Sequence, residues 1–300
     1  MVNAIKVSAA GLVASLYLPS TAGKHPVVIV LSGSDGGIAS ASWYAEPLAA
    51  LGYAVLPLAY FAMDGLPSDL VEIPLEYFKR AIDWVGAHPA LDCNRIALMG
   101  HSRGGEAALL VAATYPEIRL VVANVPSHVQ WSGIHPIPGT KIAAWSRHGV
   151  GLPFLSLARA PQPGKWREAF EETLREATPD EIDAAAIPVE RVNGPILFVS
   201  GVGDSIWPCT MMADLAVDRL RRHAFSFPVT HARYEDAGHA ILAPPFQMSA
   251  VSNPWPNSAY TRPSWRAGQA LPEMGGTPEG NRLARMNAWP AMTAFLKRHL

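Results

Sequence analysis

A serine between two glycines is the residue of this sequence best suited to act as a nucleophile. Residues 100–104 read Gly-His-Ser-Arg-Gly, a G-x-S-x-G pattern that gains its weight from context. The apolar run 95–99 before it is typical of a buried strand, and the small-residue run 106–113 after it is typical of a helix. A sharp strand-to-helix turn would hold Ser102 in a strained, accessible position. The alternative is that Ser102 only caps the helix.

A nucleophilic serine needs a histidine as base and a carboxylate that orients the histidine. Asp204 and His239 each lie on a loop just after a strand-like run. Together with the serine they give the chain order serine, acid, histidine, which is the order of a triad in this arrangement. Sites in parallel sheets also form at the carboxyl ends of the strands, where both residues lie. We therefore predict that Asp204 is the acid and His239 the base. The alternatives for the acid, Glu235 and Asp236, lie too close to His239 to come from the loop of the preceding strand.

The negative charge that develops on a substrate carbonyl needs backbone N–H donors. In a strand–turn–helix arrangement of this kind, one donor is the residue after the nucleophile, here Arg103, and the other comes from the loop after the third strand. That loop is glycine-rich, and we predict Ser34 as its donor. As further substrate-binding candidates we take His101, Asp35 and Trp207. This chemistry needs no metal and no organic cofactor.

Strand-like and helical patterns alternate over the first two thirds of the chain. The strand-like runs are 26–31, 53–60, 95–99, 120–125, 195–200 and 230–234, and the helical ones are 43–51, 73–86, 106–113 and 165–176. This alternation predicts the α/β class, with a mostly parallel central sheet and helices on both faces.

One domain over residues 1–300 explains the pattern better than two domains. Two segments, at about 126–192 and 242–281, are long, irregular and rich in Pro and Trp. Irregular segments of this length inside a compact domain are often functional. We therefore expect them to form lids over the site.

Composition excludes several classes of protein. The 300 residues are 49% hydrophobic, and Lys plus Arg (24) nearly balance Asp plus Glu (25). This balance argues against a nucleic-acid partner, which would need a basic excess, and no apolar run is long enough for membrane insertion. The two cysteines, Cys93 and Cys209, fit a reducing compartment. We expect a cytoplasmic location and leave the oligomeric state open.

The sequence resembles the C-terminal catalytic domain of the acyl-CoA thioesterase and bile acid-CoA:amino acid N-acyltransferase family. The resemblance spans roughly residues 10–300. It is carried by AYF at 59–61, LP at 66–67, IPLEYF at 73–78, GHSRGGEAAL at 100–109, IPVE at 187–190 leading into Pro195, Asp204 with Trp207, Gly-His at 238–239 with PP at 244–245, and Gly-Gly at 275–276 leading to 288–289 and 295–296.

The resemblance implies an α/β-hydrolase fold similar to dienelactone hydrolases. In this family serine members hydrolyse acyl-CoA thioesters, whereas a cysteine nucleophile accompanies conjugation to an amino acid, so Ser102 implies hydrolysis. The sequence departs from the family in two ways. We expect it to begin directly with the hydrolase strands, without the N-terminal β-sandwich domain of two-domain relatives. Arg103 and Gly105 stand where a lysine and an alanine are common.

We therefore expect a serine hydrolase that cleaves acyl thioesters through an acyl-enzyme. The alternatives are a carboxylesterase or dienelactone-hydrolase-like lactonase that does not use CoA, and an inactive binding protein on a hydrolase scaffold. Recognition of CoA would need cationic side chains near the mouth of the site. The candidates in the two irregular segments are Lys141, Arg147, Arg159, Lys165, Arg167, Arg262 and Arg266.

Overall fold

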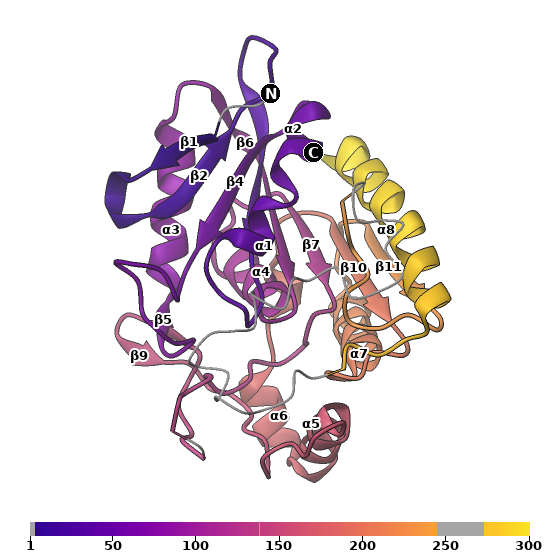
Figure 1. Cartoon of the computed structure of the whole chain (residues 1–300). Helices are drawn as coiled ribbons and strands as arrows, with labels where there is room; N and C mark the ends of the chain where they lie inside the picture. Colours follow the sequence, from indigo (N-terminus) through magenta and orange to yellow (C-terminus); the bar gives the residue numbers. More distant parts are fainter. Residues whose placement is uncertain (1–3, 138, 245–272) are drawn as a thin grey trace.

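The computed structural model describes residues 4–137, 139–244 and 273–300. Its centre is an eight-stranded sheet with the order β1-β2-β4-β3-β6-β7-β10-β11 (Figure 1). Strands from β4 to β11 in this order are parallel, whereas β2 pairs antiparallel with both β1 and β4. The strands are β1 (Ala4–Val7), β2 (Val13–Tyr17), β3 (His25–Leu31), β4 (Ala54–Ala59), β6 (Leu91–His101), β7 (Leu120–Asn124), β10 (Ile196–Gly201) and β11 (Val229–Tyr234). The mostly parallel sheet predicted from the sequence is confirmed.

The central strands are buried on both faces, which explains their continuous apolar sequences. In β3, Val27 and Ile29 belong to one hydrophobic cluster, whereas Val28 and Val30 belong to the other. Successive side chains of a strand point to opposite faces, so each cluster fills one side of the sheet.

Helices cover both faces of the sheet (Figure 1). The apolar residues of α3 and α4 and most of those of α7 pack in one cluster, and those of α1, α2 and α8 pack in the other. These helices are α1 (Ala39–Ser42), α2 (Ala45–Ala50), α3 (Leu75–Ala87), α4 (Arg103–Thr114), α7 (Cys209–Arg222) and α8 (Pro278–His299). The single helix expected over 43–51 is therefore preceded by the short α1, and the start of the one expected over 73–86 is a strand, β5 (Ile73–Pro74).

The first irregular segment, 126–192, contains more regular structure than its sequence suggested. It holds a small sheet of order β5-β8-β9 and two helices, which lie at the bottom of Figure 1. Its elements are β8 (Trp145–Arg147), β9 (Val150–Gly151), α5 (Trp166–Glu176), α6 (Pro179–Ala185) and the 3-10 turn η2 (Val189–Arg191). β8 and β9 are only three and two residues long, so local patterning does not reveal them. β8 pairs with β5 far upstream, and β9 pairs with β8. A second 3-10 turn, η1 (Ala9–Gly11), joins β1 to β2.

The second irregular segment was predicted over 242–281, but the irregular structure ends before residue 278. Residues 278–281 already belong to α8, where Thr277 caps the helix by accepting a hydrogen bond from the Gly280 N–H. Residues 245–272 lie outside the described residues.

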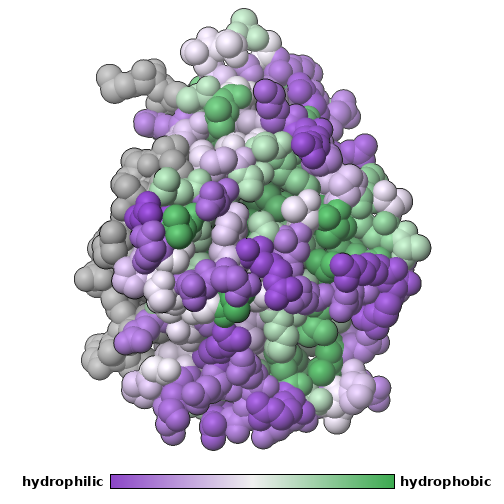
Figure 2. All heavy atoms as spheres, turned by 90° about the vertical axis from the view of Figure 1, so that its right-hand side faces the viewer, coloured by the Kyte–Doolittle hydropathy of each residue, from purple (hydrophilic) through white to green (hydrophobic). Residues whose placement is uncertain are grey.

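Hydrophilic residues cover most of the molecular face on the side of α8, with smaller apolar groups between them (Figure 2). The exposed large apolar residues of α7 and α8 are Met211, Leu215, Leu283 and Met286. No helix within the described ranges has both the length and the apolar composition needed to cross a bilayer.

Candidate active site

Ser102 lies in a tight turn between β6 and α4, with φ 55° and ψ −120°. A non-glycine residue with positive φ is strained and persists only where its surroundings impose the conformation. The neighbouring glycines are part of those surroundings. A Cβ on Gly100 would lie 1.9 Å from the carbonyl oxygen of Gly104, and a Cβ on Gly104 would lie 2.3 Å from that of Ser32. Close backbone packing thus requires glycine at positions 100 and 104 of the G-x-S-x-G pattern.

His239 and Asp204 are joined by a hydrogen bond. His239 Nδ1 lies 2.6 Å from Asp204 Oδ2, and both side chains are buried. The other carboxylate oxygen of Asp204 accepts hydrogen bonds from the N–H groups of Ile206 (2.8 Å) and Trp207 (3.3 Å). The backbone N–H of His239 donates to the carbonyl oxygen of Met274 (2.7 Å). The carboxylate that reaches the histidine ring is therefore that of Asp204, held in place by its own loop.

His101 lies beside His239, with the two rings edge to face and their centroids 4.9 Å apart. Burial and the neighbouring His239 hold the pKa of His101 well below its usual range. Asn124 Nδ2 donates to His101 Nδ1 (2.8 Å), so the proton of the neutral His101 ring is on Nε2. The side chain thus adds no positive charge next to the histidine that would act as base.

The two predicted oxyanion donors, Ser34 and Arg103, line the same cavity as Ser102 and His239. Arg103 is the first residue of α4, and the first N–H groups of a helix have no partner within it. The loop that carries Ser34 packs closely on the nucleophile turn, since a Cβ on Gly33 would lie 3.1 Å from the His101 carbonyl oxygen. Both residues therefore line the cavity of Ser102, and their role as oxyanion donors stays a prediction.

The Arg103 side chain forms a buried ion pair with Glu106 (3.2 Å). Arg103 Nη2 donates to the carbonyl oxygens of Trp131 (2.9 Å) and Ser132 (3.2 Å). Glu106 Oε1 accepts from the Trp131 N–H (3.2 Å) and from Trp145 Nε1 (2.7 Å). Burial raises the pKa of Glu106, and Arg103 opposes that shift. This pair fastens the wall of the cavity to the helix that follows Ser102.

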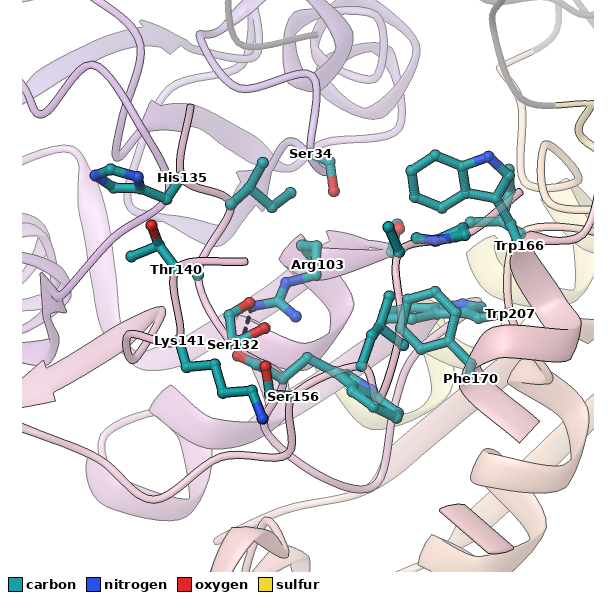
Figure 3. A pocket seen from close by; sticks show the side chains of 18 of the residues that line it. Ser34, Arg103, Ser132, His135, Thr140, Lys141, Ser156, Trp166, Phe170 and Trp207 are labelled. Carbon is teal, nitrogen blue, oxygen red and sulfur yellow. Dashed lines mark hydrogen bonds between the residues drawn. The ribbon is translucent and has the colours of Figure 1, made fainter. Parts of the chain in front are cut away.

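The cavity has a volume of about 360 Å³ and two chemically different sides. Figure 3 shows Trp166, Phe170 and Trp207 on one side. The Phe170 ring packs edge-on against Trp207, whose own ring lies 6.0 Å from that of His239. The other side carries polar residues, which include Ser132, Thr140, Lys141 and Ser156.

Two further predicted binding residues, Asp35 and Trp207, also line this cavity. Asp35 Oδ2 accepts a hydrogen bond from the Ser40 hydroxyl at 2.5 Å. Trp207 Nε1 donates to the carbonyl oxygen of Val125 at 3.0 Å. The structure therefore brings every predicted site residue to a single cavity, except Asp204, which reaches it through His239.

The cations predicted for the mouth of the site lie in different environments. Lys141 and Arg159 line the cavity, and Arg159 pairs with Glu172 (2.8 Å). Lys165 pairs with Glu168 (3.6 Å), and Arg147 is exposed on β8. Arg262 and Arg266 lie outside the described residues.

Arg167 contacts the loop of the candidate acid. Its Nη1 donates to the carbonyl oxygens of Val202 (2.8 Å) and Asp204 (3.2 Å), and its Nε donates to Glu171 (2.7 Å). Its side chain is therefore already engaged by groups of the protein, where the sequence suggested a phosphate contact.

A second serine–histidine–aspartate hydrogen-bond chain lies between β10, β11 and α7. Ser200 Oγ is 2.8 Å from His231 Nε2, and His231 Nδ1 is 3.1 Å from Asp214 Oδ1. Thr210 donates its hydroxyl proton to Ser200 Oγ (2.9 Å). Ser200 is completely buried and is not part of the cavity lining, so no substrate reaches its oxygen.

Sequence reasoning missed two residues that shape the site, Glu106 and Asn124, and gave Arg167 a different role. Glu106 carried a usable signal, since it is a lone charge at the start of a small-residue helix, and a buried charge needs a partner. Asn124 lies near the end of the buried strand predicted over 120–125, at the edge where sites form. The contacts of Arg167 span 35 and 37 residues, and no local pattern indicates them.

Comparison with known proteins gives one family. The family model described as "BAAT / Acyl-CoA thioester hydrolase C terminal" matches residues 73–300. Acyl-coenzyme A thioesterase 6 of Homo sapiens is 30% identical over 291 residues, which cover 96% of this chain and 63% of that protein. Acyl-coenzyme A amino acid N-acyltransferase 2 of Rattus norvegicus is 30% identical over 292 residues, covering 95% and 63%. The chain thus spans less than two thirds of the length of these relatives.

Solved structures similar to this one share its fold. A dienelactone hydrolase-like promiscuous phosphotriesterase from metagenomic libraries superposes with a TM-score of 0.56 at 16% identity, covering 99% of this chain and 98% of that one. The fold is that of the α/β hydrolases.

Proposed function

Because this chain belongs to the BAAT / acyl-CoA thioester hydrolase family, we propose that it is a serine hydrolase that cleaves acyl thioesters through an acyl-enzyme. The observation that carries the proposal is the buried Asp204–His239 hydrogen bond of 2.6 Å. It lies beside a cavity that Ser102 and His239 both line.

The proposed reaction begins when Ser102 Oγ attacks the thioester carbonyl and its proton passes to His239 Nε2. The Asp204 carboxylate holds the Nδ1–H tautomer and stabilises the imidazolium. The N–H groups of Arg103 and Ser34 stabilise the tetrahedral oxyanion. The C–S bond then breaks, and the leaving sulfur takes the proton from His239. A water molecule, deprotonated by His239, attacks the acyl-enzyme, releases the carboxylic acid and restores Ser102.

The test is to compare hydrolysis of hexanoyl-CoA and p-nitrophenyl hexanoate by the wild-type chain and by Ser102→Ala. We expect the wild type to cleave the thioester and the variant to show almost no turnover. A wild-type protein that binds both compounds and cleaves neither would contradict the proposal and favour a binding protein.

A simple ester is the second candidate substrate, and one observation favours it. Of the five described cations that could bind CoA phosphates, Arg159, Lys165 and Arg167 already pair with carboxylates of the protein. Exposed charge contacts weaken as salt rises. If CoA phosphates are recognised, KM for hexanoyl-CoA rises between low and physiological salt, while KM for the neutral ester stays constant. An equal change in KM with salt for both substrates would favour a simple esterase.

A further inference from the structure

The polar side of the cavity contains a lysine whose charge is not balanced within the protein. Lys141 lines the cavity at its exposed rim. It takes part in no ion pair or hydrogen bond with any residue of the described ranges. The other cations of the lining are paired: Arg103 with Glu106 and Arg159 with Glu172. Lys141 is therefore the described cation of this cavity that is available to a ligand.

Two hydroxyl groups lie on the same side of the cavity as this lysine. Arg103 also lines the cavity, but it is 5% exposed and its guanidinium is held by Glu106 and by the Trp131 and Ser132 carbonyl oxygens. Figure 3 shows Ser132 between Arg103 and Lys141, with Ser156 beside the lysine. One available cation and two hydroxyl groups thus lie along one side of the cavity.

The charge distribution of the lining suits an anion at this side. Asp35 is the acidic residue that the described lining contains. It belongs to the loop of Ser34, and its carboxylate already accepts from Ser40. Figure 3 shows Ser34 apart from Lys141, across the cavity. The opposite wall is formed by indole and phenyl rings, which suit the apolar part of an acyl chain.

We propose that the side of the cavity formed by Lys141, Ser132 and Ser156 binds an anionic oxygen group of the substrate. The group is a carboxylate on the acyl chain or a phosphate of a CoA leaving group, since both present the same acceptor chemistry. This inference rests on the proposed function, because it assigns a part of the substrate to a part of the same site.

The experiment compares three substrates with one six-carbon acyl skeleton: p-nitrophenyl hexanoate, mono-p-nitrophenyl adipate and hexanoyl-CoA. The variants are Lys141→Met and Lys141→Arg. The matched control is Lys297→Met, which removes an exposed lysine of α8 that does not line the cavity. We expect Lys141→Met to raise KM about tenfold for an anionic substrate, the effect of one lost charge-assisted contact. Neutral hexanoate should be unaffected, and Lys141→Arg should retain the wild-type KM.

If Lys141→Met raises KM only for the adipate ester, the bound group is a carboxylate on the acyl chain. If it raises KM only for hexanoyl-CoA, the bound group is a phosphate of CoA. An unchanged KM for both anionic substrates, or an equal rise in KM for the neutral ester, would overturn the proposal. Binding of adipate and of free CoA to Ser102→Ala, with and without Lys141→Met, is measured by calorimetry. This arm tests the subsite even if no substrate is cleaved, so its failure and that of the proposed hydrolysis remain distinguishable.

Discussion

Ser102 has a backbone conformation that costs free energy. Close packing at the neighbouring glycines maintains this conformation, and the Ser102 backbone N–H donates a hydrogen bond to the Asn124 carbonyl oxygen (2.9 Å). Replacing Ser102 with alanine leaves these backbone contacts in place. We expect a folded protein whose kcat falls by several orders of magnitude, since a nucleophile that acts as part of a triad cannot be replaced by its partners. Steady-state ester hydrolysis measures the loss, and circular dichroism verifies the fold. Substantial turnover by a well-folded variant would show that Ser102 is not the nucleophile.

The carboxylate of Asp204 is the one within hydrogen-bond distance of His239. Asn at this position keeps the size of the side chain but loses its charge, so we expect Asp204→Asn to reduce kcat about 10³- to 10⁴-fold. Asp236→Asn is the matched control, because Asp236 lies on the loop of His239. Its main-chain oxygen, which accepts from the Thr277 N–H at 2.7 Å, is unaffected by the substitution. Comparable losses in the two variants would contradict the assignment of Asp204.

At this scale, what sequence reasoning finds depends on whether a residue acts locally. Ser102, Asp204 and His239 could be proposed as candidates because each follows a strand, and strand ends are visible as apolar runs. Arg103 was identified for its N–H, but its side chain has a role that depends on Trp131 and Ser132, 28 and 29 residues away. Contacts between residues this far apart in the sequence arise from tertiary packing, and no local spacing of residues predicts them.

Helix α5 connects the cavity wall to the loop of the candidate acid. Phe170 lines the cavity, while Arg167 binds the carbonyl oxygens of Val202 and Asp204. Arg167 is therefore expected to be a positioning residue for the acid loop. We expect Arg167→Met to lower kcat/KM for a neutral ester roughly tenfold through a looser acid loop, while Arg175→Met, an exposed arginine of the same helix, changes it little. Lysine at position 167 should restore part of the activity.

The elements that were predicted well are those with a long, uniform pattern. The strands of the parallel sheet and helices α3, α4 and α5 were located within a few residues, because their apolar periodicity extends over a full element. β8 and β9 were missed, because strands of three and two residues have no periodicity to detect.

For the whole molecule, buried neutral histidines make stability depend on pH. Burial lowers the pKa of His128 from 6.5 to about 4, and its Nδ1 has no hydrogen-bond partner in the described part of the chain. Below pH 6.5 the unfolded chain binds a proton that the folded protein excludes, so stability falls as pH decreases toward the folded pKa. At pH 5 this group costs about 2 kcal/mol relative to pH 8.

The His128→Asn variant removes this titration. Urea unfolding at pH 8 and pH 5 should show that the variant loses about 2 kcal/mol less stability than the wild type between the two conditions. Parallel losses in the two proteins would show that His128 is protonated as readily in the folded state as in the unfolded chain.

The Ser200–His231–Asp214 chain has a consequence for chemical labelling of this protein. Judged by side-chain contacts alone, it looks like a reactive serine site. A fluorophosphonate warhead, however, must reach the oxygen in line and needs donors for the developing charge, whereas Ser200 is enclosed and its oxygen accepts the Thr210 proton. Mass spectrometry after labelling should therefore find the adduct on the peptide of Ser102 and leave that of Ser200 unmodified.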